Sequence, residues 1–174
     1  MPKYICLLRG INVGGKNIIK MAELRSALPE IGWENAKTWI QSGNIIFESK
    51  STIAKPDAIT RLLKENWGYD VPAQVVSARK WLQVVANNPF EHADKKHLYL
   101  TLLEEMPNRQ LVEEIREQDF GDDEFAVELN CIYLLCPNGV SRTRLTNNFF
   151  ERKLKTAATT RNWNTVLKLL RMSS

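Results

Sequence analysis

Two hydrophobic periods alternate along the first half of the chain. Short runs rich in apolar and β-branched residues predict strands at 4–8, 38–40, 45–47 and 73–76. Apolar residues three and four positions apart predict helices between those runs, at 21–31 and 57–67. The expected order is β-α-β-β-α-β, and a third helix follows and ends before Pro89.

The second half repeats this order. Strands are predicted at 97–103, 125–129 and 132–135, with a short extended piece at 157–159. Pro107 is expected to open one helix, 149–154 to form a second, and Asn162 to cap the last. The pattern predicts an α+β protein of two ferredoxin-like α/β plaits, residues 1–78 and 79–174, each an antiparallel sheet with helices on one face.

Composition narrows the class of protein without revealing its function. Of the 174 residues, 44% are hydrophobic and 25% charged, which excludes disordered, collagen-like and disulfide-rich chains. No apolar stretch is long enough for a membrane span, and the first residues do not resemble a signal peptide, so we expect a cytoplasmic protein. Three cysteines, Cys6, Cys131 and Cys136, fit no metal spacing and are expected to be small buried side chains in a reducing compartment.

Charge is distributed unevenly along the chain. The net charge is +4, but residues 91–136 hold 12 acidic and 4 basic side chains, whereas residues 137–174 hold 8 basic and 1 acidic. The first 50 residues are also basic, with 7 basic and 4 acidic side chains. The two basic ends either meet and form a positive patch for an anion, or remain two solvated faces.

A glycine-rich loop follows the first predicted strand. Residues 10–17, GINVGGKN, nearly match the phosphate-binding P-loop, but Asn17 stands where a hydroxyl should hold magnesium, and the antiparallel order is wrong for that fold. The loop can still form an anion-binding nest, in which backbone N–H groups at Gly14 and Gly15 are assisted by Arg9 and Lys16. The alternative is a tight turn that simply requires glycine. We include Asn12 and Asn17 among the candidate ligand-binding residues.

A second polar segment, Gln41-Ser42-Gly43-Asn44, reads by itself only as a hairpin turn. In a plait, however, the first and third strands are central neighbours. We therefore expect Gln41, Ser42 and Asn44 to lie near Arg9 and the glycine loop, within reach of one ligand.

Donor side chains also gather near the end of the chain, at 141–144 and 159–164. We take Arg144, Arg161 and Asn162 as candidate ligand-binding residues, because the second group opens a helix whose N-terminus favours anions. The alternative is an ordinary helix cap, with Arg161 solvated and Trp163 in the core. Neither histidine has metal-ligand spacing and no nucleophile motif is present, so no metal, cofactor or catalytic residue is assigned.

Four motifs taken together are similar to those of one family. They are Leu8–Gly15, Gln41–Asn44, Asn88-Pro89-Phe90 and Thr159–Val166, and in this order they resemble the bacterial domain of unknown function catalogued as family 1697. The resemblance spans nearly the whole chain and implies two α/β-plait domains, but no established activity. Members commonly have Ser-Lys-Leu where this chain has Thr143-Arg144-Leu145, so a role that needs a deprotonated lysine does not carry over.

Three functions remain open on the sequence alone. The first is binding of a small phosphate- or carboxylate-bearing ligand by the loop and the basic cluster, with or without catalysis. The second is binding of single-stranded nucleic acid by a plait sheet, although no aromatic-rich strand motif is present. The third is a protein-interaction module without a ligand. We expect a monomer or homodimer and no membrane association.

Overall fold

The structure is a computed structural model that describes residues 1–51 and 54–174. It is an α+β protein with two four-stranded antiparallel sheets, whose strand orders are β2-β3-β1-β4 and β6-β7-β5-β8. The chain divides into two compact units, Met1–Gln83 with Leu169–Ser174, and Val84–Lys168. Whether the segments 1–78 and 79–174 behave as independent domains stays a prediction.

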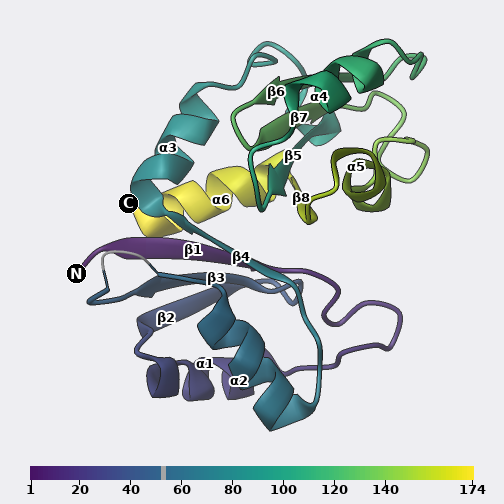
Figure 1. Ribbon diagram of the computed structural model, residues 1–174. Helices are drawn as coiled ribbons and strands as arrows, with labels where there is room; N and C mark the ends of the chain where they lie inside the picture. The colour runs from purple at the N-terminus through teal and green to yellow at the C-terminus, as the bar shows by residue number, and fades with distance from the viewer. Residues whose placement is uncertain (52–53) are drawn as a thin grey trace. The chain divides into compact units, whose positions relative to one another are not determined.

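The first unit follows the expected order of elements (Figure 1). They are β1 (Lys3–Leu8), α1 (Met21–Ala27), β2 (Glu34–Trp39), β3 (Asn44–Glu48), α2 (Asp57–Trp67), β4 (Ala73–Ser77) and α3 (Ala78–Ala86). Helix α1 is shorter than the apolar spacing suggested, because Pro29 falls in a 3-10 turn, Leu28–Ile31. Gly32, with a φ of 74°, ends that turn in the left-handed conformation that glycine adopts at little cost.

The second unit repeats the order. Its elements are β5 (Leu98–Leu103), α4 (Arg109–Arg116), β6 (Glu124–Glu128), β7 (Cys131–Leu135), α5 (Asn147–Leu154), β8 (Ala158–Asn162) and the first part of α6 (Trp163–Ser173). The residues of α6 from Leu169 onward belong to the first unit. The prediction that Pro107 opens α4 is wrong by two residues. The side chain of Asn108 accepts hydrogen bonds from the N–H groups of Gln110 and Leu111, so Asn108 caps the helix and Arg109 begins it.

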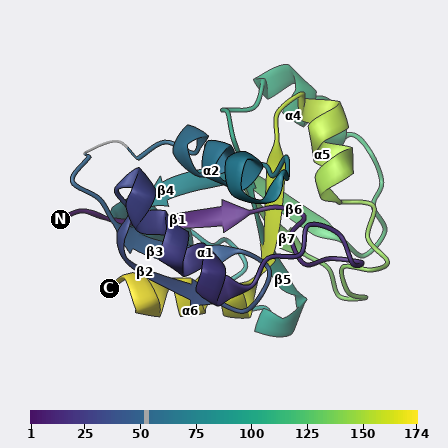
Figure 2. The ribbon, with the colours of Figure 1, turned by 90° about the horizontal axis from the view of Figure 1, so that it is seen from below.

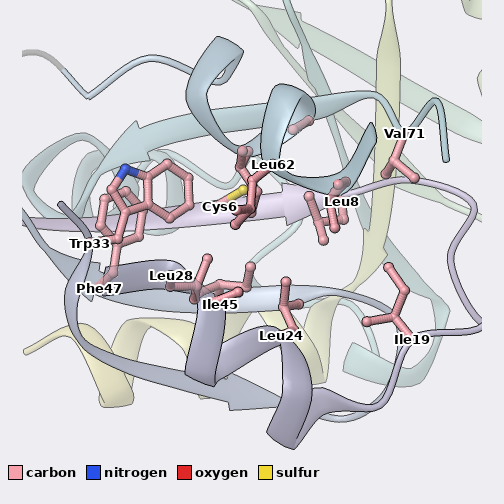
Figure 3. Packing of buried hydrophobic residues seen from close by; sticks show 14 of the residues in the cluster. Cys6, Leu8, Ile19, Leu24, Leu28, Trp33, Ile45, Phe47, Leu62 and Val71 are labelled. Carbon is pink, nitrogen blue, oxygen red and sulfur yellow. The ribbon is translucent and has the colours of Figure 1, made fainter. Parts of the chain in front are cut away.

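Helices α1 and α2 cover one face of the first sheet (Figures 1 and 2). Buried side chains fill the space between these helices and the sheet, and Figure 3 shows how the side chains pack. The ring of Trp33 stacks on Phe47 with 3.7 Å between centroids, and Phe47 also stacks on Tyr4. Alternate residues of β1, such as Cys6 and Leu8, point into this core, as the period of two predicts.

The second unit buries a cluster of aromatic residues against its sheet. Phe120 contacts Phe125 and Phe149 edge to face, and Phe149 contacts Phe150. On the other face of this sheet, Tyr133 is 2% exposed and donates its hydroxyl to the carbonyl oxygen of Val84 at 2.8 Å. Both faces of the sheet therefore carry buried side chains.

The structure tests the sequence predictions for the three cysteines and for the end of the second strand. Cys6, Cys131 and Cys136 are buried free thiols, as expected. Ile40, predicted to end the second strand, lies instead in the following turn with a φ of 50°, because the chain must reverse before β3 begins at Asn44. In the part of the chain that is described, no helix combines the length and the apolarity needed to cross a membrane.

Candidate functional site

The glycine-rich loop leaves the sheet at the end of β1, where two other segments meet it. The N–H of Leu8 donates to the carbonyl oxygen of Gly43 at 2.8 Å, and the N–H of Arg9 donates to that of Pro72 at 3.0 Å. The loop, the β2–β3 turn and the segment before β4 therefore share one edge of the first unit. This follows from the strand order, in which β1 lies between β3 and β4.

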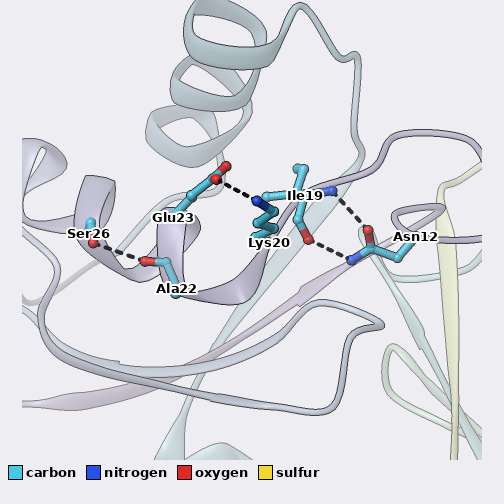
Figure 4. Close-up of polar contacts among 6 residues, drawn as sticks. All are labelled: Asn12, Ile19, Lys20, Ala22, Glu23 and Ser26. Atoms are coloured by element: carbon cyan, nitrogen blue, oxygen red, sulfur yellow. Dashed lines mark hydrogen bonds and ion pairs between the residues drawn. The ribbon is translucent and has the colours of Figure 1, made fainter.

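Asn12 ties the loop to the turn. Its side-chain Nδ2 donates to the carbonyl oxygens of Ile19, at 3.0 Å, and Gln41, at 2.8 Å, while its Oδ1 accepts from the N–H of Ile19 at 2.8 Å. Figure 4 shows the pair of bonds between Asn12 and Ile19. Both amide protons are used in this way, so Asn12 holds the site together rather than offering a donor to a ligand.

The two loop glycines form the tip of a tight turn. Gly14 and Gly15 have φ values of 57° and 74°, and the N–H of Lys16 donates to the carbonyl oxygen of Val13 at 3.0 Å. Positive φ at both central positions is what a type I′ turn requires. Helix α1 begins only at Met21, and β1 is antiparallel to both of its neighbours. Neither feature belongs to a P-loop, so the structure agrees with rejecting that motif.

Two further candidate asparagines also serve the backbone. The Nδ2 of Asn17 donates to the carbonyl oxygen of Gly10 at 2.9 Å and closes the base of the loop. The Nδ2 of Asn44 donates to the carbonyl oxygen of Trp39 and to the Oγ of Ser42, each at 3.0 Å, inside the β2–β3 turn. Together with Asn12, these residues fix the shape of the edge. They are uncharged, so the charge that attracts an anion must come from other side chains.

Positive charge at this edge comes from three side chains. Arg9 is partly exposed, Lys16 is exposed, and the Nζ of Lys20 lies 3.7 Å from the carboxylate of Glu23 (Figure 4). Gln41 is exposed at the turn and Ser42 is partly exposed. An anion that reaches this surface meets Arg9 and Lys16 on a backbone that Asn12 has already ordered.

Arg144, Arg161 and Asn162 belong to the second unit. Asn162 accepts at its Oδ1 from the N–H of Thr165 at 2.9 Å, so it caps α6 as predicted. Arg161 donates from Nη1 to the carbonyl oxygen of Thr160 at 3.0 Å. Arg144 donates to the carbonyl oxygen of Asp119 at 3.0 Å, and its guanidinium lies 5.1 Å from the centre of the Phe120 ring.

Other polar groups of the C-terminal segment bond to one another. The hydroxyl of Thr160 donates to the Oδ1 of Asn147 at 2.6 Å, so the hydroxyl of Thr101, 2.7 Å away, is the donor between the two threonines. Trp163 is 4% exposed and lies in the core, as expected if this segment is an ordinary helix cap. These contacts favour a structural role for most of the segment.

The groups with shifted pKa lie in the second unit. Burial raises the pKa of the Cys136 thiol to about 11, and burial also raises the pKa of Tyr133. Both side chains are therefore protonated and poor nucleophiles at neutral pH. Among residues 1–51 and 54–174, no cluster of three or more His, Cys, Asp or Glu side chains could hold a metal ion.

Sequence reasoning missed two residues that build the edge. Pro72 receives the Arg9 N–H, and this position could have been found because the fourth strand of the expected order pairs with the first. Gly43 was interpreted only as a turn residue. A Cβ there would lie 2.6 Å from the Cβ of Leu8 and 2.8 Å from the Cδ1 of Ile11, a close approach that no local pattern signals.

Comparison with known proteins supports the fold but assigns no activity. The structure of a conserved bacterial protein from Streptococcus pneumoniae matches with a TM-score of 0.72 at 24% sequence identity, over 99% of each chain. At this identity the likeness shows the fold alone. None of the curated proteins matches the chain. A family model, described as "Protein of unknown function (DUF1697)", matches residues 1–133. The chain thus belongs to the DUF1697 family.

Proposed function

We propose that the protein binds a small phosphate- or carboxylate-bearing ligand at the edge formed by loop 10–17 and the β2–β3 turn. The observation that carries the proposal is the bond from Asn12 to the carbonyl oxygen of Gln41, because it joins two polar segments into one ordered surface. Arg9 and Lys16 supply the positive charge there. A surface ordered before binding loses less entropy when the ligand arrives.

The roles of the candidate residues differ within this proposal. Arg9 and Lys16 attract the anion, and Gln41 and Ser42 offer polar atoms beside it. Gly14 and Gly15 allow close approach, since nothing lies within 4 Å of the place where a Cβ would stand at either one. Three candidate residues of the second unit belong to the proposed site only if they contact the same ligand. They are Arg144, Arg161 and Asn162.

The proposal is tested by thermal unfolding in the presence of inorganic phosphate, nucleoside monophosphates and citrate. A ligand at 100 times its Kd stabilises the native state by about 2.7 kcal/mol, which raises Tm by several degrees. We expect this increase in the wild type, with a loss of most of it in Arg9→Ala and in Lys16→Ala.

Matched controls are Arg61→Ala on α2 and Lys153→Ala on α5, both exposed cations outside the edge. They should keep the wild-type response. A response that falls equally in the controls would show general charge screening, and no response to any anion would overturn the proposal. If Arg161→Ala alone abolished the response, the site would belong to the second unit.

The nucleic-acid alternative depends on exposed aromatic residues on the strands, of which Trp39, Tyr99 and Phe125 are partly exposed and the other three are buried. Tyr4, Phe47 and Tyr133 are each at most 5% exposed, so these strand aromatics do not offer a stacking platform for bases. Single-stranded RNA, tested in the same thermal assay at several salt concentrations, distinguishes nucleic-acid binding from small-anion binding. RNA binding through phosphates weakens steeply with salt. A stable dimer that responds to no ligand would favour the interaction module.

The same proposal includes three finer expectations. The strand order β2-β3-β1-β4, and its repeat in the second sheet, support ferredoxin-like plaits as the topology of both units. The free buried cysteines support a reducing compartment such as the cytoplasm. The likeness to a protein of Streptococcus pneumoniae supports a bacterial source.

A further inference from the structure

A hollow of about 230 Å³ lies between helix α4 and strand β6 in the second unit. Its lining includes the apolar side chains of Met106, Val112, Val127 and Leu129. Met106 is 63% exposed and Leu129 is 61% exposed, and exposed apolar side chains that gather beside one hollow are typical of an interaction site. The anion-binding proposal makes no use of this surface.

Strand β6 forms one edge of its sheet. Among the described residues it pairs only with β7, so the backbone groups on its other side meet no described strand. Such an edge can accept an extended peptide as a further strand, with main-chain hydrogen bonds giving affinity and neighbouring pockets giving specificity. The hollow beside β6 is a pocket of this kind.

One residue that lines the hollow, Leu129, has a strained backbone conformation. Leu129 has a φ of 53°, in the left-handed region that is unfavourable for a residue other than glycine. Asn or Gly would adopt this conformation more cheaply and would also remove the exposed apolar side chain. The strained residue therefore presents an apolar side chain to solvent at the end of the edge strand.

Charge on the two faces of β6 selects the kind of peptide. Phe125 and Val127 face α4, whose charged residues at the hollow are Arg109, Glu113 and Arg116. Glu113 and Arg116 form an ion pair with each other, and no described acidic side chain forms an ion pair with Arg109, so the charge of this lining is net positive. Glu124 and Glu128 alternate with them and lie on the opposite face. A peptide on this edge therefore meets positive charge and apolar surface on one face and negative charge on the other.

We propose that β6 binds an extended peptide as a fifth strand, with acidic and apolar side chains toward α4 and a basic side chain on the opposite face. Antiparallel pairing matches the rest of the sheet. Arg109 and Leu129 line the same hollow. Glu128, at this end of the strand, already accepts a hydrogen bond from Asn87, so the basic residue of the peptide is placed opposite Glu124 at the start of the strand. The acidic residue of the peptide therefore precedes its basic residue.

The test uses the full chain labelled with ¹⁵N and an N-acetylated, C-amidated peptide of sequence Asp-Thr-Val-Thr-Val-Lys. Its Asp and two Val side chains share one face, and its Lys lies on the other. We expect saturable shifts of the β6 amide signals. N-methylation at alternate amides should abolish binding for the set that faces β6 and have little effect for the other set.

Reversing the charge of Arg109 provides a second test of the proposal. Arg109→Glu should weaken binding of this peptide about tenfold and should improve binding of a peptide with Lys at the Arg109 end. The variant should fold, because a glutamate at the first position of a helix interacts favourably with the helix dipole. Arg61→Glu on α2 is the control and should leave both affinities unchanged.

Three outcomes would overturn the inference. They are absence of β6 shifts at millimolar peptide, binding that ignores which amides are methylated, and binding that ignores the charge at Arg109. Self-association that perturbs the β6 signals without peptide would assign the edge to a second copy and would also overturn it. None of these outcomes bears on anion binding in the first unit.

Discussion

Ile40 and Leu129 occupy corresponding positions in the two hairpins and share a left-handed backbone, with φ values of 50° and 53°. Each follows the second strand of its unit directly, after Trp39 and after Glu128. Both side chains are exposed, Ile40 by 49% and Leu129 by 61%. The two units thus repeat a local backbone conformation as well as an order of elements.

This relationship predicts that asparagine at either position stabilises the protein. Asparagine tolerates the left-handed region better than isoleucine or leucine, so Ile40→Asn and Leu129→Asn should each raise the free energy of unfolding by about 0.5–1 kcal/mol. Urea denaturation measures the change. Val140→Asn is the control, because Val140 is exposed without a positive φ. A loss of stability in both variants would show that the exposed side chains make contacts worth more than the strain.

Asn12→Ala should lower the free energy of unfolding by about 2–3 kcal/mol, since it removes three hydrogen bonds of roughly 1 kcal/mol each. Asn12→Asp should cost at least as much, because a carboxylate oxygen would then face the carbonyl oxygens of Ile19 and Gln41 in place of the donor. Denaturation in urea gives both values, with Asn164→Ala on the exposed start of α6 as control. An unchanged midpoint for Asn12→Ala would mean that loop and turn do not depend on this side chain.

Gly43→Ala should be among the most damaging single substitutions in the first unit. The new Cβ would meet the Cβ of Leu8 at 2.6 Å, and the residue has a φ of 84°, so strain and overlap add to a loss of about 3 kcal/mol or more. Gly14→Ala has a φ of 57° but open space around it, and should cost only about 1 kcal/mol. Thermal unfolding of the two variants checks the order. Equal losses would contradict the packing argument.

Stability should decline in alkaline solution through Cys136. Burial raises the pKa of its thiol from 9.0 to about 11, so the unfolded chain loses this proton first as pH rises. The contribution is complete below pH 9 and is lost as the pH rises toward 11. Tyr133 acts in the same direction at higher pH, because burial raises its pKa too.

Urea midpoints of the wild type and Cys136→Ala at several pH values between 8 and 11 isolate the thiol. The difference in stability between the two proteins should shrink as pH rises. The native thiol should also react slowly with a maleimide, since Cys136 is fully buried. A difference that stays constant with pH would show that the thiol titrates alike in both states.

The spacing of apolar residues was enough to predict most elements of both units. Prediction failed at the start of α4, which depends on the side-chain hydrogen bonds of Asn108, and at Ile40, which lies in the turn because the chain reverses before β3. Asn108 could have been recognised as the cap, because its residue type and its place before the apolar stripe are the usual signal. The left-handed Ile40 could not, because isoleucine is a poor choice for that conformation.

The candidate site divides in the same way. The expected strand order predicted that loop 10–17 lies near the β2–β3 turn, and the bond between Asn12 and Gln41 confirms it. The sequence did not predict that three asparagines donate their side-chain N–H groups to backbone carbonyl oxygens. They are Asn12, Asn17 and Asn44. An asparagine in a loop has the same sequence signature whether it holds the fold or a ligand.

The sequence by itself determined the alternation of strands and helices, the repeat of that order and the charge carried by each segment, because these depend on neighbours a few residues apart. Only the tertiary structure decided which polar groups satisfy one another, how closely Gly43 approaches Leu8, and that β6 is left as an edge beside a hollow. Those features depend on residues far apart in the chain, whose contacts arise only when the sheets form and buried polar groups must find partners.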